Sequence, residues 1–479
     1  MKPIPMPPSG TPALVGGMPA EEFRRAAHEA VEWIVNYLVN IRDYPVLAQV
    51  EPGALADSLP GTAPEQGEPF EAIFEDFRRL IVPGITHWNH PRFFAYFAIS
   101  GSAPGILAEM LAAALNANGM LWKSSPAVTE LEQVALGWLR QWVGLPESFF
   151  GITYDTASLS TLHAIAAARE SADPQARTQG ASPNLVLYCS GQAHSSVEKG
   201  AIAIGIGQRT VRKIPVDAEF RMRPDALREA VRSDVAAGRR PFCVVATAGT
   251  TSTTSVDPVP EIAGIAAEHN LWLHVDGAYG GSAAIIPEFR HVLAGAADAD
   301  SVVINPHKWL LTPTDISAFY TRRPEILRRA FSLVPDYLRT ADNPRAVNLM
   351  DYGVPLGRRF RALKLWFVMR YFGHQRMAAI LRSHIDLARQ FAGWVEGDGR
   401  FELAAPVPLS VVCFRRKGPD GPNQRLLEAV NSTGEAFLSH TVLNGRFVLR
   451  LAVGNMATRR EDLELVWRRI QTEAARLED

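Results

Sequence analysis

Cysteine is scarce in this chain, with three residues in 479. Cys189, Cys243 and Cys413 are far apart, and each lies in an apolar run such as NLVLYC or PFCVVA. Disulfide frameworks belong to small secreted chains rich in cysteine, so we expect buried, reduced thiols here. Reduced thiols favour the cytoplasm as the location.

An excess of one charge is also missing, because 49 Lys and Arg nearly balance 50 Asp and Glu. No global field therefore points to nucleic acid or to an anionic membrane surface, and a small molecule is the better default partner. No stretch is long and apolar enough to cross a bilayer, and the proline-rich first twenty residues lack the apolar core of a signal peptide. We expect neither a nucleic-acid nor a membrane partner.

The pattern of apolar residues divides the chain into three parts. Residues 1–90 hold a proline-rich leader and two helical patterns, whose apolar stripes are too few for a core and suggest docking on another subunit. From about residue 125, strand-like runs alternate with helical stretches, which predicts βαβ units and a mainly parallel sheet. We expect a dimerisation arm (1–90), a large α/β domain (91–370) and a small C-terminal α+β domain (371–479).

Polar residues follow several of the strand-like runs. In open α/β sheets, ligands bind beyond the carboxyl ends of the strands. NLVLYC is followed by SGQAHSS with His194, FCVVATAG by TTSTT, LWLHV by Asp276, and SVVIN by PHKW with Lys308. One histidine, one aspartate and one lysine at such ends predict a cofactor site.

Each of these residues also has an ordinary structural interpretation. A lysine near a strand end is most often a solvated surface charge, but Lys308 precedes Trp309-Leu310-Leu311. Desolvation there would lower its pKa from about 10.4 and make the neutral amine a nucleophile toward an aldehyde. Asp276 could be a helix N-cap, or it could keep a pyridine nitrogen protonated. His194 could be a core histidine, or its ring could stack on a cofactor.

Several motifs together resemble one family, the group II decarboxylases that depend on pyridoxal 5'-phosphate (PLP) and share the fold of aspartate aminotransferase. The motifs are NPHKW, QAHSSVEKG, HVDGAYGGSA, SPAVTELE, PLGRRFRALKLWF and HPRFFAYF, in the family's order, and the resemblance runs from about Glu21 to the C terminus. It implies a PLP-dependent transferase of fold type I, with a mainly parallel sheet and a small C-terminal α+β domain.

Carried over position by position, the resemblance implies a role for each matching residue. Lys308 would carry the cofactor as a Schiff base, Asp276 would pair with its pyridine nitrogen, and His194 would stack on its ring. A loop tyrosine of the family protonates the substrate carbon after carbon dioxide leaves, and Tyr352 matches that position, with His194 assisting. The resemblance further implies cofactor contacts from Ala157, Ser158, Thr251, Asn305 and His307.

The substrate pocket implied by the resemblance is mostly aromatic or apolar. Its lining would be Trp88, Tyr96, Phe97, Ala98 and Ile99, with Asn118 and Met120 from the other subunit of a homodimer whose active sites lie at the interface. Such a lining favours an aromatic substrate, because glutamate would place an unpaired carboxylate against it. Gly357 stands where histidine decarboxylases and phenol-preferring plant relatives have serine, which leaves room for an indole.

The sequence therefore predicts decarboxylation of an aromatic L-amino acid, namely tryptophan, tyrosine, phenylalanine or dihydroxyphenylalanine (DOPA), to its amine. Three alternatives stay open: an aldehyde synthase, in which the loop tyrosine is typically phenylalanine; a transaminase; and a retired enzyme kept as a dimeric scaffold. Two histidines in HWNH lack a third ligand nearby, so we expect no metal. The stretch YDTASLS departs from the glycine-rich phosphate loop of animal members, and the loop that holds Tyr352 is shorter than theirs.

Overall fold

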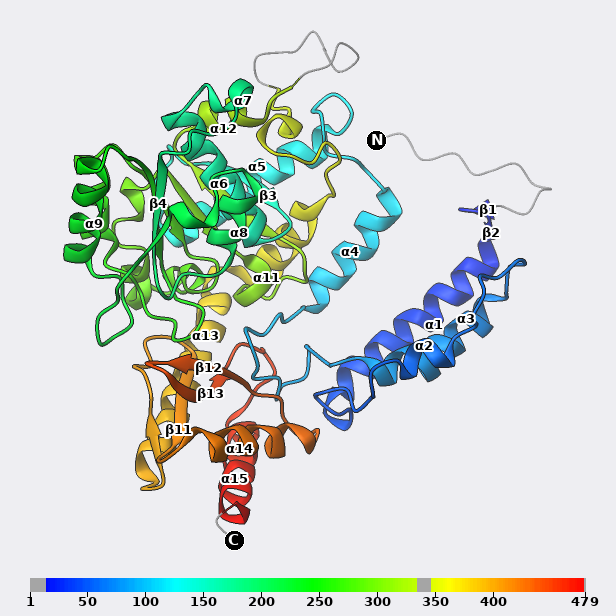
Figure 1. Cartoon of the computed structure of the whole chain (residues 1–479). Coiled ribbons are helices and arrows are strands. Elements are labelled where there is room, and N and C mark those ends of the chain that lie inside the picture. The colour runs from blue at the N-terminus through cyan, green and yellow to red at the C-terminus, as the bar shows by residue number, and fades with distance from the viewer. Residues whose placement is uncertain (1–13, 334–345, 478–479) are drawn as a thin grey trace.

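The computed structural model describes residues 14–333 and 346–477 (Figure 1). It begins with a helical arm, which extends away from the rest of the chain in Figure 1. Helix α1 forms where apolar residues were predicted to recur at helical spacing, and Ala26 alone of its residues is buried. The arm consists of β1 (Leu14–Val15), β2 (Met18–Pro19), α1 (Ala20–Val39), η1 (Ile41–Asp43), α2 (Ala54–Ser58), α3 (Phe70–Asp76), η2 (Phe77–Ile81) and η3 (Val82–Gly84).

A seven-stranded sheet forms the centre of the molecule, in the order β3-β9-β8-β7-β6-β4-β5. The strands β5, β4, β6, β7 and β8 are parallel, whereas β9 is antiparallel to both of its neighbours, β8 and β3. Their bounds are β3 (Phe150–Tyr154), β4 (Leu185–Ser190), β5 (Val211–Ile214), β6 (Arg240–Thr247), β7 (Trp272–Asp276), β8 (Ser301–Ile304) and β9 (Ser317–Thr321).

Helices cover both faces of this sheet, as the alternation of strands and helices predicted. Side chains of successive strand residues point to opposite faces. In β4, Val186 and Tyr188 pack into one core cluster, while Leu185, Leu187 and Cys189 pack into another. The helices are α4 (Ala103–Leu115), α5 (Pro126–Val143), α6 (Ala157–Ala172), α7 (Ala176–Gln179), α8 (Ser196–Ala203), α9 (Pro224–Ala236), α10 (Val259–Glu268), α11 (Pro306–Trp309) and α12 (Pro324–Phe331), with short turns η4 (Gln208–Thr210), η5 (Gly280–Ile285), η6 (Pro287–Leu293), η7 (Ala296–Asp298) and η9 (Leu349–Tyr352).

A long helix, α13 (Arg361–Gly397), connects the large sheet to a smaller C-terminal part (Figure 1). It bends at Gly373, whose φ of 65° lies outside the helical region and favours glycine. The predicted domain boundary at residue 370 falls inside this helix. Beyond it lie an antiparallel sheet in the order β10-β11-β13-β12 and two helices: β10 (Phe401–Leu403), β11 (Val411–Arg416), α14 (Asp420–Ser432), β12 (Ser439–Leu443), β13 (Arg446–Ala452) and α15 (Arg460–Arg476).

The segment that leaves the arm binds to the C-terminal part before the chain enters the large sheet. The Phe94 backbone N–H donates to the Phe437 carbonyl at 2.8 Å, and the Phe94 carbonyl accepts from the Ala452 N–H at 2.9 Å. This pairing places Trp88 to Ile99 between the two sheets. Among the described helices, none combines the length and the apolar character that crossing a membrane requires.

Candidate active site

The polar residues predicted for the site lie at one edge of the large sheet. Because β9 runs opposite to both β8 and β3, strand β3 points the same way as the parallel strands, and all their carboxyl ends meet at that edge. Asp276 is the last residue of β7. Ala157 and Ser158 follow β3, His194 follows β4, Thr251 follows β6, and Asn305, His307 and Lys308 follow β8.

A pocket of about 340 Å³ opens at this edge, between the large sheet and the C-terminal part. Its lining residues come from three parts of the chain: the segment after the arm, the loops of the large sheet, and the C-terminal part. The lining consists of Trp88, Tyr96, Phe97, Ile99, His194, Thr251, Ser252, Lys308, Ser439, His440, Thr441 and Arg450. Trp88, Tyr96, Phe97, Ile99, His194, Thr251 and Lys308 were predicted from the sequence.

Lys308 is one of the residues that line this pocket. Its Nζ is 5.3 Å from the centroid of the Phe97 ring. Burial lowers the pKa of Lys308, the negative charge of Asp276 opposes this shift, and the positive charge of Arg450 adds to it. A lowered pKa keeps a larger fraction of the amine neutral, which is the form that attacks an aldehyde carbon.

Asp276 supplies a buried negative charge next to the lysine. Its side chain is 5% exposed, and its Oδ1 accepts a hydrogen bond from the Ala278 backbone N–H at 3.1 Å. Its charge raises the pKa of both His194 and Lys308 against the effect of burial. A buried carboxylate of this kind suits a protonated ring nitrogen, because buried charges need a partner.

The imidazole of His194 has a defined tautomer. The Ser196 backbone N–H donates to His194 Nδ1 at 3.1 Å, so Nδ1 is an acceptor and the neutral ring carries its proton on Nε2. The surrounding walls desolvate the ring and lower its pKa, and this outweighs the opposing charge of Asp276. His194 is therefore neutral near pH 7 and has an N–H on Nε2.

Asn305 and His307 indicate a site for an anionic group. The Ile316 backbone N–H donates to His307 Nδ1 at 2.9 Å, and burial lowers the pKa of His307 to about 4, so the neutral ring carries its proton on Nε2. Asn305 Nδ2 lies 3.3 Å from that nitrogen, while the buried Asn305 Oδ1 has no partner among the described residues. With the amide turned over, Oδ1 accepts from His307 and the amide N–H groups become available to a phosphate.

The start of α6 offers further donors at the same edge. Thr156 caps the helix, with its Oγ1 accepting from the Leu159 N–H at 3.4 Å. Ala157 and Ser158 form the first turn, where backbone N–H groups have no partner within the helix and attract anions. The lysine, the carboxylate and these donors fit the aldehyde, ring nitrogen and phosphate of PLP.

Three residues predicted for the substrate pocket, Asn118, Met120 and Gly357, do not line it. The Arg358 N–H donates to Asn118 Oδ1 at 2.9 Å, and the Met350 N–H donates to the Met120 carbonyl at 3.1 Å. A Cβ on Gly357 would lie 3.8 Å from Asn118 Nδ2. Asn118 and Gly357 therefore lie side by side, with Met120 two residues further along the chain.

Tyr352 also lies away from the lining residues. Its backbone carbonyl accepts from the Tyr154 hydroxyl at 2.5 Å, and its ring centroid is 4.9 Å from that of Phe150. Burial raises the pKa of its phenol, which keeps it protonated. The sequence contains another tyrosine, Tyr337, among residues 334–345, which lie outside the described residues.

Sequence reasoning missed the contribution of the C-terminal part, above all Arg450. This buried arginine donates from Nε to the Ser252 carbonyl at 3.1 Å and from Nη1 to the Tyr96 carbonyl, and its guanidinium lies 4.6 Å from the Phe97 ring centroid. Arg450 thus connects β13 to Tyr96 and Ser252, two residues that line the pocket. The signal was a charged residue interrupting the apolar strand RFVLRLAVG.

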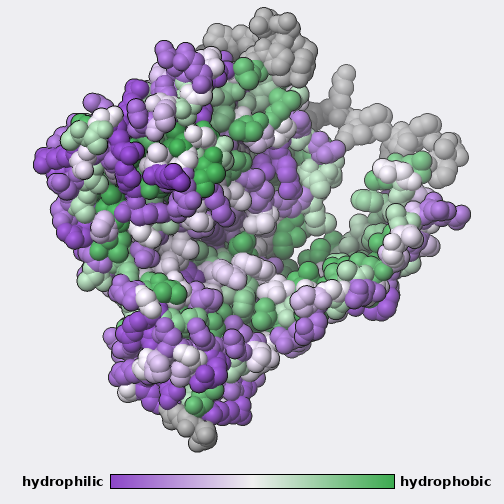
Figure 2. Space-filling view, viewed as in Figure 1, coloured by the Kyte–Doolittle hydropathy of each residue, from purple (hydrophilic) through white to green (hydrophobic). Residues whose placement is uncertain are grey.

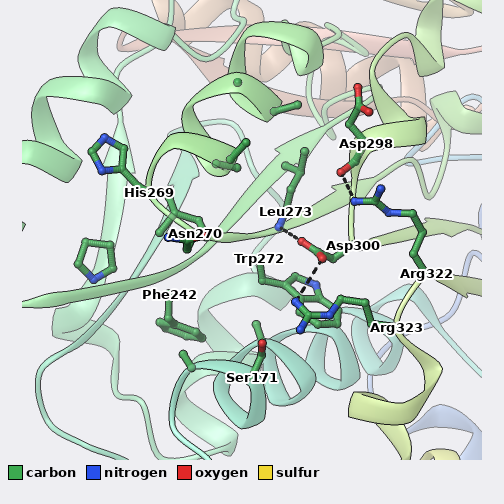
Figure 3. Close-up of a pocket in the computed structure, with 18 of the residues that line it drawn as sticks. Ser171, Phe242, His269, Asn270, Trp272, Leu273, Asp298, Asp300, Arg322 and Arg323 are labelled. Carbon is green, nitrogen blue, oxygen red and sulfur yellow. Dashed lines mark hydrogen bonds and ion pairs between the residues drawn. The ribbon is translucent and has the colours of Figure 1, made fainter.

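A larger hollow, of about 990 Å³, lies at the opposite edge of the sheet (Figure 3). Two of its charged side chains bond to the protein itself: Asp300 Oδ2 accepts from the Leu273 N–H at 2.9 Å, and Arg322 donates to the Asp298 carbonyl at 2.6 Å. None of the residues predicted for the site lines it. We therefore assign the function to the smaller pocket.

Known proteins share both the sequence pattern and the fold. The model of the pyridoxal-dependent decarboxylase conserved domain matches residues 52–417. A curated aromatic-L-amino-acid decarboxylase of Bos taurus is 44% identical, over 96% of this chain and 97% of its own. The structure of Oryza sativa TDC with PLP and tryptamine has a TM-score of 0.93 and 37% identity, covering 96% of this chain and 99% of that one. The structure of Rhodiola rosea 4-hydroxyphenylacetaldehyde synthase has a TM-score of 0.89 and 38% identity, with the same coverage.

The sheet and the edge that carries Lys308 and Asp276 are those of a PLP-dependent enzyme of fold type I. Within that class, the chain belongs to the pyridoxal-dependent decarboxylase family.

Proposed function

We propose that this chain uses PLP to decarboxylate an aromatic L-amino acid to the corresponding amine and carbon dioxide. The observation that carries the proposal is the position of Lys308, whose pKa is lowered, in a pocket with aromatic walls one strand away from the buried Asp276. The candidate substrates are tryptophan, tyrosine, phenylalanine and DOPA.

Different residues of the chain would hold different parts of the cofactor. Lys308 would bind its aldehyde carbon, Asp276 would pair with its ring nitrogen, and Asn305, with the first turn of α6, would hold its phosphate. When bound, PLP supplies an electron-withdrawing ring that takes up the electrons of the bond to the leaving carboxylate. Asp276 would keep that ring positively charged, and His194 would contribute a neutral imidazole to the wall of the pocket.

The walls of the pocket select the substrate side chain. Trp88 and Tyr96 stack at a centroid distance of 5.8 Å and are 37% and 55% exposed. Exposed aromatic faces at a pocket attract another aromatic ring, which gains both burial and stacking. Against the faces of these two rings, a side-chain carboxylate would lose its water without gaining a partner.

The product distribution tests the proposed reaction. Protein loaded with PLP is incubated with each aromatic amino acid, with histidine and glutamate as controls, and amine, aldehyde and hydrogen peroxide are measured. Amine and carbon dioxide in equal amounts, from aromatic substrates alone, are the expected result. Amino-group transfer to a keto acid would identify a transaminase, and no product from any of the substrates would favour the retired scaffold.

The second candidate is an aldehyde synthase, which the likeness to the Rhodiola rosea enzyme favours. Such an enzyme couples decarboxylation to oxidative deamination, so aldehyde and hydrogen peroxide would form in step with carbon dioxide. We favour the amine because the sequence keeps a tyrosine, Tyr352, where the resemblance places the loop tyrosine.

The Tyr352→Phe variant tests the assignment of the proton donor. If Tyr352 protonates the substrate carbon, removing its hydroxyl diverts product from amine to aldehyde, by about tenfold or more in ratio. Tyr337→Phe, measured in the same way, is the matched comparison, because Tyr337 lies between α12 and Tyr352 in the sequence. Unchanged amine from Tyr352→Phe with diverted product from Tyr337→Phe would transfer the role to Tyr337.

We further infer that the chain works as a cytoplasmic homodimer with Asn118 and Met120 of one subunit facing the pocket of the other. Large apolar side chains are exposed along α4 and the arm, among them Leu107, Leu111, Leu115 and Val39. Figure 2 shows apolar residues (green) on the sides of the arm and of the body that face each other. Exposed apolar surface of this extent is typical of an interface. The free, buried cysteines support the location.

Placing a charge on this surface tests the dimer. Leu111→Asp should convert the dimer to monomers and lower activity, because an unpaired carboxylate in an apolar interface costs several kcal/mol. Mass measured by light scattering after gel filtration reports the change. Val442→Asp, at a residue that is 60% exposed on β12, is the control and should stay dimeric. A monomeric unaltered protein with full activity would contradict the inference.

A further inference from the structure

The helix that carries Lys308 is too short to be stable alone. Helix α11 has four residues, whereas isolated helices need roughly twelve or more. Directly after it, Leu311 is buried with a φ of +54°, a conformation that a side chain of this size rarely adopts. Such a backbone persists only where surrounding contacts determine it. The position of Lys308 therefore depends on contacts made by its neighbours.

Trp309, the next residue, makes the most extensive of these contacts. Its side chain is fully buried, and its ring stacks on Tyr279 at 4.5 Å with an interplanar angle of 6°. Tyr279 in turn stacks on Phe97 at 3.8 Å, and the Phe97 ring lies 5.3 Å from Lys308 Nζ. The stack thus starts at the lysine's neighbour and returns to the lysine's amine.

His384 of α13 fixes the orientation of the Trp309 ring. The indole Nε1–H donates to His384 Nδ1 at 3.0 Å. His384 is 1% exposed, and burial lowers its pKa to about 4, so the ring is neutral and carries its proton on Nε2. That side of the ring binds the backbone of Asn455, whose side chain donates to the Asn89 carbonyl at 2.8 Å.

We propose that His384 is a positioning residue for Lys308, which it holds in place through the indole N–H of Trp309. Without the acceptor, a buried indole N–H would be left unpaired, and the ring would turn to find another partner. Trp309 and Lys308 are neighbours in the same short helix. A rotation of the Trp309 ring therefore moves the amine of Lys308. The inference rests on the proposed function, which assigns Lys308 to the cofactor.

Two substitutions at position 384 separate the two nitrogens of the imidazole. In His384→Asn, the amide oxygen takes the place of Nδ1 and keeps the acceptor for Trp309. In His384→Gln, the amide nitrogen takes the place of Nε2 and keeps the contact with Asn455 but loses that acceptor. Trp309→Phe removes the indole N–H and keeps a ring for stacking on Tyr279.

The measurement is the rate at which protein freed of PLP captures added PLP, followed by the absorbance of the lysine-bound cofactor without substrate. We expect capture of PLP to be about tenfold slower in His384→Gln and in Trp309→Phe, and near normal in His384→Asn. Combining His384→Gln with Trp309→Phe should slow capture no further than either change alone. In the loaded enzyme, kcat should fall in the same order while KM stays unchanged.

Trp272→Phe is the matched control. It also removes a buried indole hydrogen bond, from Nε1 to Ser301 Oγ at 2.9 Å, but at the opposite edge of the sheet (Figure 3). It should lower thermal stability and leave capture unchanged. Normal capture in His384→Gln, or equal slowing in Trp272→Phe, would overturn the inference. A chain that captures PLP in the expected order but decarboxylates no aromatic amino acid would overturn the proposed function alone.

Discussion

Replacing Lys308 with alanine is expected to abolish turnover of aromatic amino acids, with a loss of roughly 1,000-fold or more, or about 4 kcal/mol of transition-state stabilisation. The amine is the nucleophile that binds the aldehyde, and among residues 14–333 and 346–477 no other lysine lines the pocket. The absorbance of the lysine-bound cofactor should disappear. Formation of the amine, measured by liquid chromatography, should stop as well.

Lys213→Ala is the control for the loss of a lysine. Lys213 is partly exposed on β5 and pairs with Glu198 at 2.9 Å, so its removal changes a charge without touching the pocket. It should leave both absorbance and turnover close to those of the unaltered protein. Undiminished amine formation by Lys308→Ala would remove Lys308 from its assigned role.

Asp276→Asn is expected to lower kcat by several hundred-fold to several thousand-fold. The amide keeps the shape of the side chain and can still accept from the Ala278 N–H, but it cannot balance a positive charge. Breaking a buried ion pair in this way costs about 3 to 5 kcal/mol. Turnover should fall far more than the affinity for PLP, because the phosphate contacts still hold the cofactor. Titrating PLP-free protein with PLP measures that affinity.

Asp300→Asn makes the same chemical change at the other edge of the sheet. Asp300 is also largely buried and accepts a backbone N–H, from Leu273, but it lies in the hollow shown in Figure 3. Its substitution should leave kcat unchanged. Equal losses in the two variants would mean that Asp276 acts through stability and not through the cofactor.

The sheet and the residues at its strand ends could be predicted because each depends on local sequence. Alternating apolar runs identify the strands, and the residue that follows a run must lie at the end of that strand. Asp276 and Lys308 are placed correctly at one edge for this reason. The antiparallel β9 was not foreseen, because a buried run of five residues has the same pattern in either direction.

The walls of the pocket depend on contacts between distant segments, which the sequence pattern does not reveal. Arg450 interrupts an apolar strand, which marks it as unusual, but the sequence does not show that it reaches Tyr96 and Ser252. Tyr352 was assigned because its position in NLMDYGVPLGRRF resembles that of the family's loop tyrosine, and this resemblance does not show that its ring packs against Phe150. Its role in protonation stays a prediction.

The reversed direction of β9 has a consequence for the dynamics of the site. Lys308 lies in a link of twelve residues, 305–316, that joins two hydrogen-bonded neighbours in the middle of the sheet. Separating the strands at the two ends of that link requires breaking β8 from β9, which amounts to global unfolding and not to local opening. Amide hydrogens of β8 and β9 should therefore exchange with deuterium among the slowest in the chain, whereas those of α1 exchange early.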